Sequence, residues 1–126
     1  MILDTHAFLW WGLAPERLSR RARSVLSDPD REFLWSVAST WELAIKARTG
    51  KLVLGVALSE FLDERLRSQG VGVLAVEQRH AIRVAALPLH HRDPFDRMLV
   101  AQAQLEGVPI LSADPKLRRY GVEIVW

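Results

Sequence analysis

The alternation of short apolar runs with helical segments is the feature that most constrains how this chain can fold. Five apolar runs have the length and composition of buried strands, at residues 1–3, 32–36, 71–76, 108–112 and 122–126. Segments with helical spacing lie between them. Strands that alternate with helices predict an α/β fold, in which helices on both faces cover a central, mainly parallel sheet of four to five strands.

Capping and turn residues indicate where these helices begin and end. Thr5, Ser19 and Asp93 are expected to cap helices, Pro94 suits a first helical position, and Gly50 suits the left-handed position after a last turn. The helices are predicted at about 5–12, 19–26, 38–49, 59–68, 78–87 and 93–107, with a short turn or helix at 115–120.

Length and composition favour one compact domain over residues 1–126. The chain is 49% hydrophobic, a share that supports a sizeable core. It has no cysteine, and its four histidines show no zinc-motif spacing, so disulfides and thiolate metal sites are excluded. A net charge of +2 is too small to indicate nucleic-acid binding. No signal peptide or membrane-spanning run is apparent, so a soluble, cytoplasmic protein is expected.

Four acidic residues stand where predicted strands give way to helices: Asp4, Glu42, Asp96 and Asp114. In an open α/β sheet these points lie along the carboxyl edge of the strands, where ligands bind. Residues distant in sequence are therefore expected to converge there. Four gathered carboxylates repel one another strongly unless a cation neutralises them.

Each acid also has a local explanation. Asp4 and Asp114 suit a helix cap or a turn, and Asp96 gains from the helix dipole three residues after Asp93. Glu42 ends the segment Ser39-Thr40-Trp41-Glu42, which spells a capping box. These accounts would have to place four acids at one sheet edge by coincidence, so the joint interpretation is the stronger one.

A cluster of carboxylates without cysteine suits a hard cation such as Mg²⁺, and Mn²⁺ accepts the same oxygen ligands. Such a site activates a bound water and stabilises a leaving oxygen, which favours phosphodiester hydrolysis. No histidine is needed as a base. His80, His90 and His91 show no recognisable catalytic arrangement, and His6 is interpreted as structural or as a hydrogen-bond donor behind the metal.

Four segments closely resemble the PIN-domain ribonucleases, specifically the VapC toxins of bacterial type II toxin-antitoxin systems. These segments are LDTHAFLWW at 3–11, STWELAIKARTGKL at 39–52, LPLHHRDPFDRMLVAQA at 87–103 and LSADPKL at 111–117. The resemblance spans nearly the whole chain and implies a single PIN domain with a three-layer α/β sandwich.

The resemblance also implies an activity and a site. Asp4, Glu42, Asp96 and Asp114 would form the acidic metal pocket, with Asp4 and Asp96 as the strongest ligands and Asp93 as a cap. Thr5 and Ser112 match polar positions that orient water.

The expected activity is Mg²⁺-dependent endoribonuclease action on an RNA of the tRNA or rRNA class, blocked by a cognate VapB-like antitoxin, in a protein that forms a homodimer. The five tryptophans are candidates for the dimer or antitoxin surface, although core packing explains most of them; they are Trp10, Trp11, Trp35, Trp41 and Trp126.

Two alternatives remain at this point. The first is a catalytically silent PIN-like domain that binds RNA or an antitoxin through its acids. The second, a phosphatase or phospho-receiver, is weaker. The first strand carries one acid in place of a pair, and no phosphate-binding glycine loop is present.

Overall fold

The computed structural model describes residues 1–126 as a five-stranded parallel sheet flanked by helices. The strand order is β3-β2-β1-β4-β5, which places the first strand at the centre. The strands are β1 (Ile2–Leu3), β2 (Leu34–Ser36), β3 (Gly72–Leu74), β4 (Ile110–Leu111) and β5 (Ile124–Val125). The predicted α/β class and parallel sheet are confirmed.

The helices lie close to their predicted positions. They are α1 (Thr5–Leu13), α2 (Arg20–Leu26), α3 (Val37–Arg48), α4 (Leu58–Ser68), α5 (Gln78–Ala85) and α6 (Pro94–Glu106). Two 3₁₀ helices are η1 (Pro15–Arg17), which was not predicted, and η2 (Pro115–Tyr120), which was. No helix has both the length and the apolar character needed to cross a membrane.

The caps explain several of these boundaries. Ser19 accepts a hydrogen bond from the backbone of Ala22, and Asp93 caps α6, both as predicted. Thr5 was expected to cap α1, but Asp4 does so, because its side chain accepts the backbone N–H of His6. Gly107 ends α6 with φ of 65°, in the left-handed region where glycine has no steric penalty.

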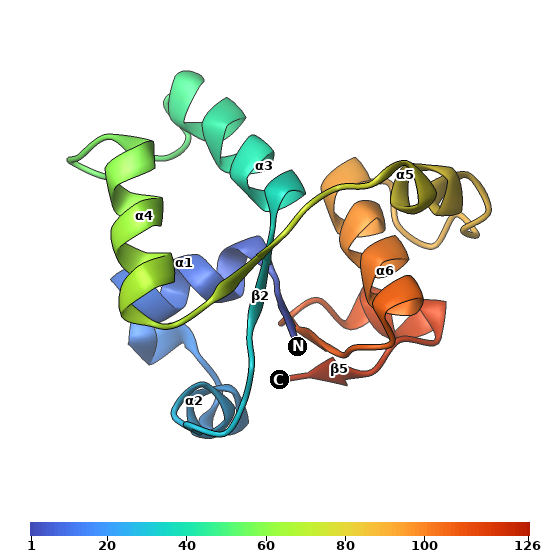
Figure 1. Ribbon diagram of the computed structural model, residues 1–126, viewed down its shortest axis with the longest axis horizontal. Helices are drawn as coiled ribbons and strands as arrows, with labels where there is room; N and C mark the ends of the chain where they lie inside the picture. The colour runs from blue at the N-terminus through green and yellow to red at the C-terminus, as the bar shows by residue number, and fades with distance from the viewer.

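The pairing register sends alternate strand residues to opposite faces of the sheet. Leu3 pairs with Leu111, and both lie in the core formed with α1, α2, α3 and α4. Ile2 pairs with Ile110, and both lie in the second core, formed mainly with α6 and η2. Figure 1 shows α1, α2 and α4 on one side of the sheet and α5 and α6 on the other. Two apolar layers thus pack on opposite faces of the sheet and fix the positions of its strands.

Candidate active site

The central strand leads directly into the candidate site. Asp4 follows β1, is buried, and caps α1 through a 2.8 Å hydrogen bond from the backbone N–H of His6 to its Oδ1. Its other oxygen accepts a hydrogen bond from the hydroxyl of Ser112, at the end of β4. Asp4 therefore both caps α1 and belongs to the group of four acids. Its role as a cap does not exclude a role in the site.

Ser112 joins two of the predicted acids. Its hydroxyl donates to Asp4 and accepts the backbone N–H of Asp114 at 3.1 Å. Asp114 begins η2, where its Oδ1 accepts the backbone N–H of Lys116 at 2.8 Å. The strand order reverses between β1 and β4, and ligands bind at such switch points in open α/β sheets.

Glu42 reaches the same edge from within α3. Its Oε2 accepts a hydrogen bond from the hydroxyl of Thr5 at 2.5 Å, and its Oε1 pairs with Nζ of Lys46 at 2.6 Å. The expected capping box is wrong. The helix begins at Val37, directly after β2, with Ser36 as its cap, so Glu42 lies more than one turn inside it. Its side chain therefore takes no part in capping the helix.

Asp96 lies in the first turn of α6, and its predicted position at the end of a strand is wrong. It does not follow a strand, because α5 and a loop separate β3 from α6. It still reaches the carboxyl edge because α6 starts there and returns to the opposite edge before β4. The backbone N–H of Asp96 donates to Oδ1 of Asp93, which confirms Asp93 as the cap.

His91 is the residue that sequence reasoning missed. Its Nε2 lies 2.8 Å from Oδ2 of Asp114 and 3.1 Å from Oδ2 of Asp96. Its Nδ1 accepts the backbone N–H of Asp93 at 3.0 Å, so the ring hydrogen resides on Nε2 and points at the carboxylates. The ligand atoms of His91, Asp96 and Asp114 all lie within 4.8 Å of one another.

Arg97 and Tyr120 hold the loop that carries His91. The Tyr120 hydroxyl accepts the backbone N–H of His91 at 2.7 Å, and the Arg97 guanidinium donates to the Tyr120 hydroxyl at 3.2 Å. Arg97 also donates to the carbonyls of Val84, Leu87 and Pro88 at 2.8 to 3.2 Å. The only signal for this arrangement was the density of polar residues in HHRDPFDR.

Burial and neighbouring carboxylates together set the electrostatics of the edge. Burial, followed by the negative charges of Asp4 and Asp93, raises the pKa of Asp96 to about 7. Burial opposes ionisation of Asp4 as well, but hydrogen bonds from His6 and Ser112 outweigh it and lower the pKa of Asp4. The hydrogen bond to Asp4 raises the pKa of His6. One acid is held ionised while its neighbour resists ionisation.

These donors fit a divalent cation. Carboxylate oxygens from the end of β1, α3, α6 and the start of η2 gather at one edge. Burial and the neighbouring negative charges raise the pKa of Asp96, and a cation would favour its ionised form. Asp96 and Asp114 share His91, Asp4 and Glu42 lie near enough for their charges to raise the pKa of Asp96, and Glu42 is turned partly toward Lys46.

An apolar groove lies beside the acids. Its cavity of about 400 Å³ is formed by α3, α5 and the start of α6. Trp41, next to Glu42, is 65% exposed and packs edge-to-face on Phe95, next to Asp96, with ring centroids 5.3 Å apart. The other lining residues are Val37, Ala38, Val76, Ala81, Val84, Pro94 and Met98.

The family model for the PIN domain matches residues 1–123. The chain belongs to the PIN domain family. Ribonuclease VapC22 of Mycobacterium tuberculosis (strain ATCC 25618 / H37Rv) is 28% identical over 121 residues, which cover 95% of this chain and 91% of the relative. Ribonuclease VapC16 of the same strain is 34% identical over 58 residues, which cover 46% and 41%. The predicted resemblance to PIN-domain ribonucleases of the VapC group is confirmed.

A solved structure supports the fold of this PIN domain. A toxin-antitoxin complex from Klebsiella pneumoniae contains a chain that aligns with a TM-score of 0.58 at 17% identity. The alignment covers 90% of this chain and 85% of that one. At this identity the likeness concerns the fold alone.

Proposed function

We propose that this PIN domain is a Mg²⁺-dependent endoribonuclease and the toxin of a type II toxin-antitoxin system. The observation that carries the proposal is the gathering of Asp4, Glu42, Asp96 and Asp114 at the carboxyl edge where the strand order reverses between β1 and β4, with the pKa of Asp96 raised by burial and by neighbouring negative charges. The similarity to proteins named ribonucleases supports hydrolysis of RNA over other phosphoester chemistry.

The acids have different expected roles. Asp4 and Asp96 are the principal metal ligands, Asp114 supports them, and Glu42 completes the pocket. When bound, Mg²⁺ would supply an acidified water and charge stabilisation for the attacked phosphate and the leaving oxygen, and Mn²⁺ would substitute for it. Asp4 suits a ligand role because its hydrogen bonds keep it ionised.

Thr5 and Ser112 position these ligands. Each hydroxyl donates its hydrogen to a carboxylate, Thr5 to Glu42 and Ser112 to Asp4, and so limits the directions in which that carboxylate turns. Their oxygen lone pairs remain as acceptors for a water near the scissile phosphate. A water-orienting role for both residues therefore stays part of the proposal.

His91 acts as a positioning residue for Asp96 and Asp114. A metal-ligating Nε2 would have to lose its hydrogen, and the hydrogen would then move to Nδ1, where it would face the backbone N–H of Asp93. The hydrogen-bond pattern thus favours donation to the carboxylates over direct ligation. Donation from Nε2 aligns Asp114 with Asp96 across the site.

The proposed regulation is a cognate antitoxin that binds the apolar groove. Trp41 directly precedes Glu42 and Phe95 directly precedes Asp96 in the sequence, so a segment seated on them would also cover the site. The solved toxin-antitoxin complex with this fold is consistent with such a partner. A homodimer is proposed as well, and light scattering of the purified chain, alone and with its antitoxin, tests both assemblies.

The test of the function is RNA cleavage by the purified chain in the presence and absence of Mg²⁺. Cleavage of a tRNA or rRNA substrate should require the metal and should fall at least about a hundredfold in Asp4→Asn and Asp96→Asn, because loss of supporting partners alone costs up to that factor. Circular dichroism should show both variants folded. Equal cutting by both variants would contradict the site, and strong RNA binding without turnover by the unsubstituted chain would favour a silent binding domain.

A further inference from the structure

A second cavity adjoins the acids and shares no lining residue with the apolar groove. It has a volume of about 380 Å³ and is lined by Asp4, Asp114, Ala113, His6, Trp10 and Arg17. Two of its walls are thus carboxylates of the proposed metal centre, and the others are an aromatic ring, an imidazole and a guanidinium. His6 is already engaged with Asp4, whereas the side chains of Trp10 and Arg17 have no role in the site described above.

Arg17 is held over Trp10. Its guanidinium carbon lies 4.5 Å from the centre of the Trp10 ring, and that ring packs on Trp126 with centroids 5.6 Å apart. The backbone is fixed next to Arg17 as well, because Leu18 is buried in the core and Ser19 caps α2. The cation is therefore placed in advance, at little further cost in side-chain entropy.

The guanidinium of Arg17 is free to bind an anion. Arg17 is exposed and forms no ion pair with any carboxylate of the chain, whereas Lys46, Arg31 and Arg79 all do. A planar guanidinium with unused donors matches phosphate oxygens in a bidentate way. Its place in a cavity bounded by Asp4 and Asp114 puts this anion site next to the proposed metal centre.

We propose that Arg17, stacked on Trp10, binds a phosphodiester of the single-stranded RNA flanking the bond that is cut. The inference rests on the proposed function, which brings the scissile phosphate to Asp4 and Asp114. Stacked arginine planes and aromatic rings recur where proteins bind unpaired RNA. The free guanidinium complements a phosphodiester and offers no favourable partner to a basic protein segment, so RNA is the occupant proposed for this cavity.

Anisotropy of a fluorescein-labelled single-stranded RNA of mixed sequence tests this subsite. All proteins in this assay carry Asp96→Asn, so that the RNA stays intact. The assay buffer contains Mg²⁺. Arg17→Gln should weaken binding roughly threefold to tenfold and reduce the slope of log K against log salt by about 0.7, the contribution of one phosphate contact to a single strand. Arg17→Lys should lie between, because it keeps the charge but loses the planar fork.

Arg67→Gln is the matched control. Arg67 is exposed, has no ion pair, and lies near the end of α4 shortly before β3 begins, so it is at the opposite edge of the sheet. It should leave affinity and salt slope unchanged, and thermal unfolding should show both variants equally folded.

Equal RNA binding by the Arg17→Gln and Arg67→Gln proteins would overturn the inference. So would a loss of antitoxin binding on Arg17→Gln with RNA binding unchanged, which would identify a protein contact. Failure of the proposed function is separate, because it is judged by RNA cleavage with Arg17 and Asp96 intact.

Discussion

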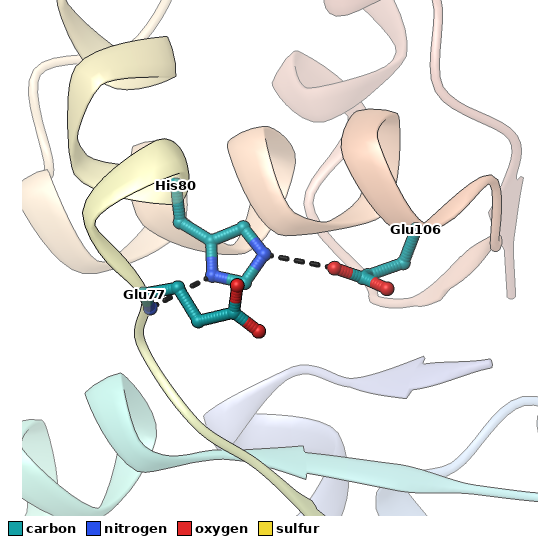
Figure 2. Close-up of side chains that lie close together, drawn as sticks. All are labelled: Glu77, His80 and Glu106. Atoms are coloured by element: carbon teal, nitrogen blue, oxygen red, sulfur yellow. Dashed lines mark hydrogen bonds and ion pairs between the residues drawn. The ribbon is translucent and has the colours of Figure 1, made fainter.

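Two clusters in this protein have the same ingredients, a histidine and two carboxylates within 4.8 Å, at opposite ends of α6. Figure 2 shows the first, in which His80 of α5 lies between Glu77 and Glu106. The second is His91 with Asp96 and Asp114. In both, Nδ1 accepts a backbone N–H at 3.0 Å, from Glu77 or from Asp93, so Nε2 presents its hydrogen to carboxylates.

Their charge balance differs. Arg79 pairs with Glu77 at 2.8 Å and also with Glu106, and its hydrogen bond lowers the pKa of Glu77. No arginine or lysine pairs with Asp96 or Asp114, and the pKa of Asp96 is raised. Negative charge without a cationic partner thus distinguishes the proposed metal centre around His91 from the His80 cluster, which joins α5 to α6.

The largest expected effect is on metal binding and RNA cleavage, which should depend on His91 and not on His80. His91→Asn loses the Nε2 donor and should reduce metal affinity and RNA cleavage about tenfold to a hundredfold. His91→Gln can place an amide N–H near the position of Nε2 and should retain more of both. Mn²⁺ titration followed by electron paramagnetic resonance gives the affinity, and kcat and KM are measured separately.

His80→Gln is the matched control for that experiment and should leave Mn²⁺ affinity unchanged. If His91→Asn binds Mn²⁺ as the unsubstituted protein does and cleaves normally, the positioning role of His91 is wrong.

The second prediction concerns stability. His80 is fully buried and bonded at both ring nitrogens, so His80→Leu should lower the free energy of unfolding by about 2 kcal/mol, since it leaves the Glu77 N–H unpaired and removes a link to Glu106. Urea denaturation at neutral pH measures this loss. A change below a few tenths of a kcal/mol would show that the cluster does not join the helices.

The third prediction is a pH dependence of stability without metal. The pKa of Asp96 is about 7 when folded and about 4 when unfolded, so the folded state binds more protons between these values. Stability should therefore fall as pH rises from about 4 to 7, by at most about 1.4 kcal/mol per pH unit.

Asp96→Asn should flatten this slope, whereas Glu106→Gln should not. Urea denaturation in EDTA at several pH values makes the comparison. Parallel slopes for the unsubstituted protein and Asp96→Asn would mean that Asp96 ionises normally in the folded chain.

Part of the proposed metal centre could be predicted from the sequence, for a physical reason. Acids beside strand ends converge because parallel strands share a carboxyl edge, so Asp4 and Asp114 could be named on that ground without coordinates. Asp96 reaches the edge for another reason, because α6 begins there. The local capping-box motif failed at Glu42 because the start of α3 is set by the end of β2, with Ser36 as cap. Capping patterns contain no information on where the preceding strand stops.

His91 and Arg17 could not be predicted in the same way. His91 depends on Arg97 and Tyr120, which hold its loop from α6 and from the end of η2. Arg17 depends on a 3₁₀ helix that the pattern did not reveal and on a ring seven residues earlier. Such contacts arise from tertiary packing between segments whose relative positions periodicity does not encode.

The most direct test of the proposed metal centre is a Mn²⁺ titration of ¹⁵N-labelled protein, read as paramagnetic broadening of backbone amide signals. The account predicts that amides around Asp4, Asp96 and Asp114 broaden first, that those around His80 and Glu106 remain sharp, and that Asp96→Asn suppresses the effect. Broadening centred on Glu77 and Glu106, or none at the carboxyl edge, would contradict it.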